Sequence, residues 1–454
     1  MTFTPHLAER RFGIGYSPRR PGPRTLDAML AALAGPDRAA ATFPIPLTDQ
    51  ITPTFEELLD LQRARRGSEE AEQAYRDGRA RMDDLRRQTF LAHLARGMET
   101  EDGFRERLVQ FWSDHFTVRA KNGLMRHYVT PYVDENIRPH VTGRFADMLK
   151  AAVKHPVMLI YLDQNRSIGP NSPAGENGRG LNENLAREVL ELHTLGVGGP
   201  YSQNDVRQLA ELLTGLSTNR ARDFWFRRNF AEPGTEEVLG QVYGPHASVA
   251  EIDRLLDDLA QHPATARHIA RKLATHFLSD DPPEAVVADM ATAFRRNDGR
   301  LLPVYTTMLR HPASWSIAPV AAKVMQPFHF VQASLRGLGL PGRTVARFDR
   351  GQTQRFLWQP MRRMGQDWER PAGPDGLNEV ADAWITPHAL AARIEWAFRV
   401  PEQLMRRLPD PRSAVYDLVG DAATSALVFA AGAAESRAEG VGLILASPAF
   451  QRRA

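Results

Sequence analysis

The sequence predicts a mainly α-helical fold, a large multi-helix domain with one small β-hairpin. Across most of the 454 residues, apolar side chains recur at the spacing of an α-helix. Glycines end several of these periodic segments and His-Pro pairs start three others, as expected at helix termini. Only residues 223–244 combine two short β-prone runs around a Pro-Gly turn, and this pattern predicts the hairpin.

Residues 1–100 form the first predicted part, an N-terminal helical segment. Its first helices are short and end on glycine. Residues 54–99 are helical in pattern and densely charged, with a break at Gly67-Ser68. This pattern predicts a long helical hairpin whose alternating charges face solvent.

Residues 101–345 form the predicted central core. Its helices carry the highest density of polar side chains within apolar stretches, and a polar loop over residues 164–180 interrupts them. Ser202 and Asp205 predict a capping box at one helix start. Three helices open on a His-Pro pair, in which proline suits the first helical position. These pairs are His155-Pro156, His262-Pro263 and His311-Pro312.

Residues 346–454 form the third predicted part. Residues 346–385 are rich in Gly, Pro, Trp and Gln, which predicts an irregular segment. Residues 386–454 are helical in pattern. We expect both terminal parts to pack on the central core rather than to fold alone.

The composition excludes several classes of site and partner. The chain has no cysteine, which excludes disulfides, thiolate metal sites, iron–sulfur clusters and cysteine nucleophiles. Its 57 Lys and Arg exceed its 54 Asp and Glu by three, and the arginines are scattered, which argues against nucleic-acid binding. No apolar run is long enough to predict a membrane span. The first residues lack the apolar stretch of a secretory signal, so the cytoplasm is the expected location.

One helix, predicted over residues 182–195, places a histidine among apolar side chains. Its apolar arc consists of Leu185, Ala186, Val189, Leu190 and Leu192. Its polar arc consists of Glu183, Asn184, Arg187, Glu188, Glu191 and Thr194. At about 100° per residue, His193 lies near the middle of the apolar arc and is predicted to point into the protein.

A second helix, within residues 103–119, repeats this pattern with His115. Its apolar arc consists of Phe104, Leu108, Phe111 and Trp112. A buried imidazole needs a hydrogen-bond partner for at least one of its nitrogens. We therefore expect the two helices to pack together, so that both histidines share a polar pocket with a carboxylate. The candidate carboxylates are Asp114, Glu188 and Glu191.

Three interpretations of this histidine pair stay open. The rings are structural and bond to backbone carbonyls, or they act with a carboxylate as a general acid/base pair, or they bind a divalent metal ion with glutamates. The metal is the less favoured alternative, and the cofactor is otherwise unknown. No H-E-x-x-H or E-x-x-H spacing is present, and Glu191 and His193 point about 200° apart on a helix.

A third polar face belongs to the helix predicted over residues 267–277, where His268, Arg271 and Lys272 lie on one side. This face could bind an acidic substrate. A solvent-exposed surface is the favoured interpretation, because basic side chains are mostly exposed.

Five segments resemble the motifs of one protein family. They are "FWSDHFTV", "HPVMLIYLD", "GLNENLAREVLELHTLGVGGPYSQNDVRQLAELLTG", "ATARHIARKLATHFLSDDPP" and "ILASPAFQRR". They are similar to the bacterial "domain of unknown function 1800" family, and the likeness runs along nearly the whole chain. The resemblance implies a largely α-helical bacterial protein with no established reaction. It also implies relatives that are frequently exported and often encoded beside a sulfatase-like protein.

The motif positions that this resemblance carries over are Trp112, His115, Asn182, Glu183, Asn184, Arg187, Glu188, Glu191, His193, Tyr201 and Asp205. The chain departs from the family pattern in two places. Asp114 stands where the pattern has asparagine, and residues 366–387 look expanded around a Pro/Trp-rich segment. A pocket wall formed by that segment is therefore expected to differ.

Two functions are expected from these observations. The first is an enzyme, a hydrolase or lyase that acts on a polar substrate such as a carbohydrate in a buried His/carboxylate pocket. Its expected catalytic residues are His115, His193, Glu188 and Glu191, and its expected substrate-binding residues are Trp112, Asp114, Asn184, Arg187 and Tyr201. The second is a non-catalytic interaction or maturation partner of a sulfatase-like protein, with the charged hairpin as docking surface.

Overall fold

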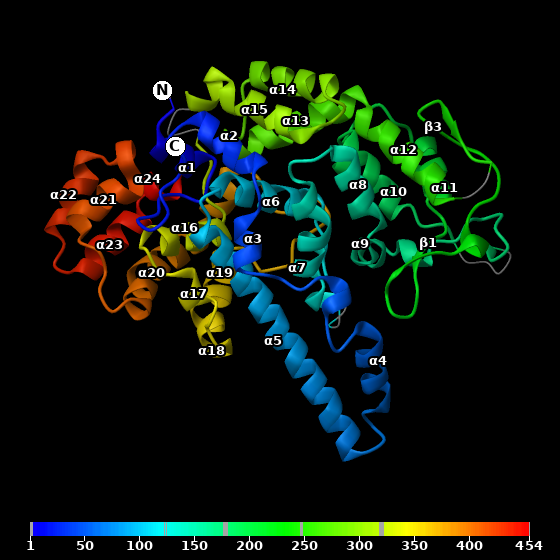
Figure 1. The fold of residues 1–454 in the computed structure, drawn as a ribbon, viewed down its shortest axis with the longest axis horizontal. Helices are drawn as coiled ribbons and strands as arrows, with labels where there is room; N and C mark the ends of the chain where they lie inside the picture. The colour runs from blue at the N-terminus through cyan, green and yellow to red at the C-terminus, as the bar shows by residue number, and fades with distance from the viewer. Residues whose placement is uncertain are drawn as a thin grey trace.

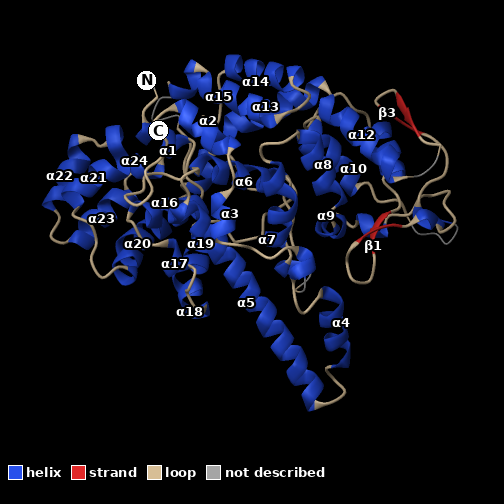
Figure 2. Ribbon diagram, in the orientation of Figure 1, coloured by secondary structure: helices blue, strands red, loops and turns tan. Residues whose placement is uncertain are grey.

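The structure is a computed structural model. It describes residues 3–121, 123, 125–175, 180–245, 248–316 and 322–453. Helices make up most of the described chain, and its named strands form two short antiparallel pairs (Figures 1 and 2). The mainly α-helical fold predicted from the sequence is confirmed.

Side-chain caps begin many of the helices. α11 (Gln203–Leu212) starts after Ser202, whose hydroxyl accepts the backbone N–H of Asp205, while the Asp205 carboxylate accepts the backbone N–H of Ser202. This is the predicted capping box. Each histidine of the three His-Pro pairs accepts, at Nδ1, the backbone N–H two residues further on, at 3.1 Å. The His-Pro pairs therefore combine a side-chain cap with proline at the first helical position.

The predicted helical hairpin consists of α4 (Phe55–Ala64) and α5 (Glu69–Glu99), which pack against each other. The pair projects from the body of the protein, with its turn at the far end (Figure 1). Buried residues are sparse in the N-terminal half of α5 and nearly continuous over residues 89–98. The charged half of the hairpin is therefore mostly solvated, as its alternating charges predict.

The largest hydrophobic core lies around α6, at the centre of the molecule (Figure 1). α13 packs on α14, α14 packs on α15, and α8 packs on α12. The helices of this part are α1 (Pro5–Arg11), α2 (Leu26–Ala34), α3 (Arg38–Thr42), α6 (Gly103–His115), α7 (Val129–Tyr132), α8 (Phe145–Lys154), α9 (Pro156–Tyr161), α10 (Asn184–Glu188), α12 (Val249–Gln261), α13 (Pro263–Phe277), α14 (Glu284–Arg296) and α15 (Leu301–Arg310).

A second core forms where the C-terminal helices pack on α5. Phe90 of α5 belongs to it together with Phe330 and Trp396, whereas Met82 of the same helix belongs to the larger core. The helices around this core are α16 (Pro327–Gly337), α17 (Gly342–Val345), α18 (Arg350–Thr353), α19 (Gln359–Arg363), α20 (Pro387–Leu404), α21 (Pro411–Val419), α22 (Ser425–Ala433), α23 (Arg437–Ala446) and α24 (Pro448–Gln451). Nowhere in the described chain does a helix combine the length and apolar character needed to cross a bilayer.

Part of the segment predicted to be irregular is helical. Residues 350–363 form α18, a π-helical turn and α19 without interruption. Asp349 and Gln352 start this stretch with a capping box that the Gly and Trp content concealed. The irregular backbone is restricted mainly to residues 364–380.

The β structure differs in detail from the predicted hairpin. The first β-prone run pairs with the segment before it, and the second run folds back on itself. At its turn, Leu239 (φ +53°) and Gly240 (φ +74°) both have positive φ, as a two-residue type I′ turn requires. Leucine is rare in that conformation, so the turn carried little sequence signal. The pairs are β1 (Leu216–Thr218) with β2 (Phe224–Phe226), and β3 (Glu236–Val238) with β4 (Gln241–Tyr243).

The helix predicted over residues 182–195 is not regular. α10 continues into a π-helical turn, Val189–Thr194, which holds one residue more per hydrogen-bonded ring than an α-helix. The periodicity predicts Thr194 on the polar arc. In the structure, Thr194 is fully buried and its hydroxyl donates to the Val189 carbonyl at 2.6 Å. A constant 100° step cannot represent this change of phase.

Candidate functional site

α6 presents two neighbouring polar residues to different surroundings. Asp102 caps the first turn of this helix, and most of the helix residues are buried. Successive side chains on a helix point about 100° apart. At its C-terminal end, Asp114 therefore faces a cavity, while His115 packs against the π-helical turn and α13.

The two predicted histidines lie together in the interior. The ring centroids of His115 and His193 are 5.7 Å apart, and both side chains are almost fully buried. Nε2 of His115 donates to the backbone carbonyl of His193 at 3.2 Å, and Nε2 of His268 donates to the carbonyl of Leu192 at 3.0 Å. The last carbonyls of a helix lack partners within the helix. These two imidazoles therefore complete the C-terminal end of the π-helical turn.

These histidines are held in their neutral form. Burial, followed by the nearby Lys272 ammonium, lowers the pKa of His193 to about 3 and that of His115 well below its ordinary value. The rings contact aromatic side chains, with Phe116 at 5.0 Å from His193. No set of three or more His, Asp or Glu side chains within the described ranges has an arrangement that could hold a metal ion.

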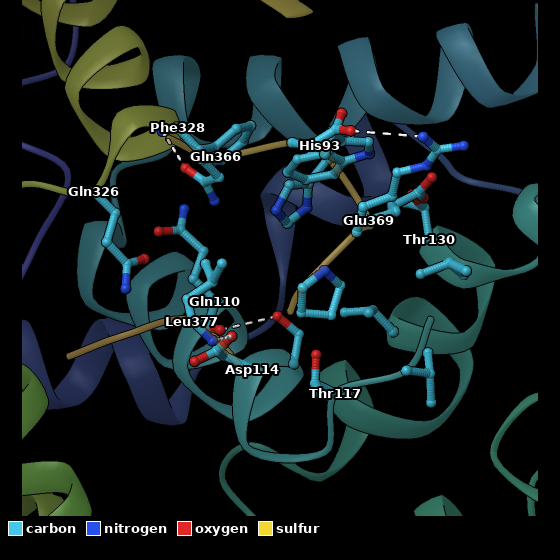
Figure 3. Close-up of a pocket in the computed structure, with 18 of the residues that line it drawn as sticks. His93, Gln110, Asp114, Thr117, Thr130, Gln326, Phe328, Gln366, Glu369 and Leu377 are labelled. Carbon is cyan, nitrogen blue, oxygen red and sulfur yellow. Dashed lines mark hydrogen bonds and ion pairs between the residues drawn. The ribbon is translucent and has the colours of Figure 1, made fainter. Parts of the chain in front are cut away.

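Residues 366–380, here called the covering segment, lie against Asp114. The backbone N–H of Leu377 donates to Oδ1 of Asp114 at 2.8 Å (Figure 3). Gly376 (φ +84°) approaches so closely that a Cβ there would lie 2.8 Å from Cγ of Asp114. Glycine is required here both by the positive φ and by this contact.

The environment of Asp114 favours its protonated form. Burial and then the Glu379 carboxylate raise its pKa to about 8, although the Leu377 N–H and Lys272 act in the opposite direction. Removal from water disfavours the ionised form of a carboxyl group and so raises its pKa. Asp114 therefore carries a proton at neutral pH.

Glu379, at the end of the covering segment, has the opposite character. Its Oε1 accepts from Nδ1 of His276 at 2.6 Å, and its Oε2 lies 3.4 Å from Nζ of Lys323. Although burial acts against ionisation, His276 and Lys323 hold the pKa of Glu379 well below its ordinary value. This carboxylate is therefore ionised throughout the neutral range.

The Glu379 contact is the first link of a buried chain of hydrogen bonds. Arg107 of α6 donates through Nη2 to Nε2 of His276 at 2.6 Å and through Nη1 to Nδ1 of His329 at 2.7 Å. Because Nε2 of the neutral His276 ring accepts from Arg107, the ring proton lies on Nδ1, which donates to Glu379. These hydrogen bonds thus join the covering segment to α6, α13 and α16.

A cavity of about 120 Å³ opens between α6, α16 and the covering segment (Figure 3). Asp114 lies on its wall with polar and aromatic neighbours. These include His93, Gln110, Thr117, Gln326, Phe328, His329, Gln366, Trp368, Glu369 and Leu377. The cavity is concave, partly apolar and lined by a few convergent polar groups, which are the features of a small-molecule site.

None of the four residues predicted to be catalytic lines this cavity. His115 and His193 lie together in the interior. Glu188 and Glu191 are partly exposed, and Glu191 accepts from Arg187 at 3.0 Å. Burial, followed by Glu191 and Asp375, raises the pKa of Glu188 to about 7.

The residues predicted to bind substrate are dispersed as well. Asp114 lies on the cavity wall. Trp112 is fully buried, and its indole N–H donates to a tyrosine hydroxyl in the core at 2.6 Å. Asn184 is exposed, Arg187 pairs with glutamates on its own helix, and Tyr201 packs against the edge of the core.

Several polar residues of this region gave little signal in the sequence. Glu379 lies 265 positions after Asp114, within residues 366–387. No local sequence pattern links it to His276. His268 and Lys272 were interpreted as surface residues, yet both are at least half-buried because the covering segment and the π-helical turn lie over α13. The His-x₃-Lys-x₃-His spacing of His268, Lys272 and His276 on one helix face could have revealed them.

Comparison with known proteins returns one match. The family described as "Protein of unknown function (DUF1800)" matches residues 7–452. No curated protein and no solved structure matches the chain. The candidate site must therefore be interpreted from its own geometry.

Proposed function

The chain belongs to the DUF1800 family, whose function is unknown, and we propose from its geometry that it is an acid–base enzyme. The proposed class is a hydrolase or lyase, and the substrate is a small polar molecule held in the cavity beside Asp114. The proposal rests on one observation. A buried carboxyl group, whose pKa burial raises to about 8, lines a concave and partly apolar cavity.

Asp114 is proposed as the general acid. A group with a pKa near the working pH can both hold a proton and release it to a leaving group. In a hydrolysis, the Asp114 proton goes to the leaving oxygen as its bond to the substrate breaks. The hydroxyl of a water molecule bonds to the other fragment, and the remaining proton of that water restores the Asp114 carboxyl.

Glu379 is proposed as a positioning residue. It lies behind the cavity wall and acts through the covering segment, whose Leu377 N–H bonds to Asp114. Its negative charge also contributes to the raised pKa of Asp114. Two carboxyl groups whose environments move their pKa values in opposite directions are a recurrent arrangement in acid–base sites.

His115 and His193 are proposed to shape the site rather than to transfer protons. A general base at neutral pH needs a pKa close to 7, whereas burial lowers the pKa of His193 to about 3. The hydrogen bond from the His115 ring to the backbone carbonyl of His193 fixes the C-terminal end of α6 against the π-helical turn. Asp114, one residue before His115, is oriented by the same contact.

The test is turnover of a panel of nitrophenyl glycosides, phosphates, sulfates and carboxylic esters between pH 5 and 9. We expect one class to be hydrolysed, with activity declining above about pH 8 as Asp114 loses its proton. Asp114→Asn should lower kcat by about 10²–10⁴-fold. The exposed Asp49→Asn is the matched control and should leave kcat unchanged. No turnover of any class, or full activity in Asp114→Asn, would reject this function.

A second candidate function is the binding of a sulfatase-like protein as a non-catalytic partner. The observation that favours it is α22, an apolar helix of nine residues in which only Ala431 is buried and Phe429 is 76% exposed. Exposed apolar patches mark many interaction surfaces. If this function is correct, the two proteins co-elute at micromolar concentration in size-exclusion chromatography, and Phe429→Ser weakens the complex. Separate elution of the wild-type proteins would exclude it.

A further inference from the structure

The charged groups on the cavity wall neutralise one another. Glu369 pairs with Arg86 at 2.8 Å and also accepts the Thr130 hydroxyl. Asp367 lies 3.7 Å from Arg370. Neither a cationic nor an anionic ligand would therefore find an opposite charge free to receive it, and a neutral ligand avoids the cost of burying an uncompensated charge.

Several hydrogen-bonding groups on the wall remain open. The Gln326 amide, which points into the cavity in Figure 3, and the Thr117 hydroxyl donate to and accept from no other described residue. The Gln366 carbonyl accepts the backbone N–H of Phe328 at 2.7 Å, which leaves its amide NH₂ open. Buried polar groups are rarely left in this state, so a ligand rich in hydroxyl groups would complete them.

One side of the cavity is aromatic. Phe328 stacks with His93 at 5.3 Å and lies 4.8 Å from Trp368. Glu369, next to this stack, has a left-handed backbone (φ +57°), a strained conformation for a residue with a side chain. Its ion pair and hydrogen bond hold the wall in this shape. The flat C–H face of a sugar ring fits such an aromatic surface, while its hydroxyls extend to the polar groups.

The size of the cavity restricts the ligand further. A volume of about 120 Å³ has room for about four water molecules at ~30 Å³ each. It can therefore take up part of one sugar ring, and a second ring would lie outside it. We infer that the cavity binds a single uncharged sugar residue. The inference rests on the proposed function in one respect only, namely that Asp114 would contact the glycosidic oxygen of the bound sugar.

Titration calorimetry of the full chain with free sugars tests this inference without any turnover. The neutral probes are glucose, galactose, mannose and N-acetylglucosamine. The charged probes, matched in size, are glucuronate and glucosamine. We expect at least one neutral probe to bind with a Kd in the millimolar range, and both charged probes to bind at least tenfold more weakly.

Variants of the wall locate the binding. Thr117→Val keeps the shape of the side chain but removes the open hydroxyl, and should weaken binding about three- to tenfold. Thr235→Val, at an exposed position, is its matched control and should have no effect. Asp114→Asn should still bind the sugar, because an asparagine oxygen can also accept the Leu377 N–H.

The outcomes separate this inference from the proposed function. If no neutral sugar binds, or if the charged sugars bind equally well, the inference is wrong even when a nitrophenyl ester or phosphate is hydrolysed. If a neutral sugar binds but no nitrophenyl glycoside is hydrolysed, the inference holds and the enzymatic function fails. An unchanged Kd in Thr117→Val places the sugar elsewhere and also overturns the inference.

Discussion

Asp114→Asn is expected to make the protein more stable than the wild type at pH 8, by about 3–5 kcal/mol in the free energy of unfolding. The folded protein keeps the Asp114 proton up to about pH 8, whereas the unfolded chain releases it near pH 4. Between these values the unfolded chain binds fewer protons, so the stability of the wild type falls as pH rises. Asparagine has no proton to lose and does not carry this cost.

The measurement is urea unfolding of both proteins at several pH values from 4 to 9. The two unfolding free energies should be close below pH 4 and should separate progressively up to about pH 8. The exposed Asp49→Asn should follow the wild type throughout. A constant difference across this range would show that Asp114 is ionised in the folded protein. Greater stability together with lost turnover would be the trade-off found at active sites.

Local patterns were sufficient to predict most of the fold. The helical hairpin, the Ser202 capping box and the helix starts at His-Pro follow from side-chain chemistry within a few residues, and the structure has each of them. The π-helical turn at Val189–Thr194 and the strand pairing of residues 216–243 depend on contacts made by the folded chain. A periodicity count contains no information about such contacts.

The candidate site was also predictable only in part, because local patterns place some of its residues and tertiary contacts place the others. The apolar arcs of two helices were enough to place His115 and His193 in the interior, and their rings lie 5.7 Å apart. The sequence could not show which carboxylate lies at the site, because this depends on tertiary contacts. Glu188 and Glu191 are close to His193 in sequence but remain partly exposed, whereas Glu379 reaches the interior from a distant segment.

The Asp114 side chain and the covering segment belong to one arrangement. Leu377 of that segment donates a backbone N–H to the Asp114 side chain, which either an aspartate or an asparagine oxygen can accept. Only aspartate adds a proton that can be transferred. Asp114→Asn is therefore expected to keep the cavity and to lack this general acid.

Glu379→Ala is expected to destabilise the protein by about 3–5 kcal/mol, because it removes the anion that compensates several buried cations. Lys323 is 2% exposed, and Arg107 and Arg453 are similarly buried around the same carboxylate. Lys323 would keep Asp280 at 2.5 Å, but His276 would lose its only carboxylate partner among the described residues. Urea unfolding at pH 7 measures this loss.

Glu379→Gln is the matched variant for this experiment, since its amide oxygen can still accept the His276 N–H without the negative charge. Its loss of stability should be smaller than that of Glu379→Ala. The pKa of Glu379 is lowered in the folded protein, so its charge stabilises the fold above the ordinary glutamate pKa, and this contribution falls as the solution becomes more acidic. The gap between wild type and Glu379→Gln should therefore narrow below about pH 4.5. Equal stability of all three proteins at pH 7 would show that this carboxylate does not hold the covering segment in place, and the orientation of Asp114 would then need another cause.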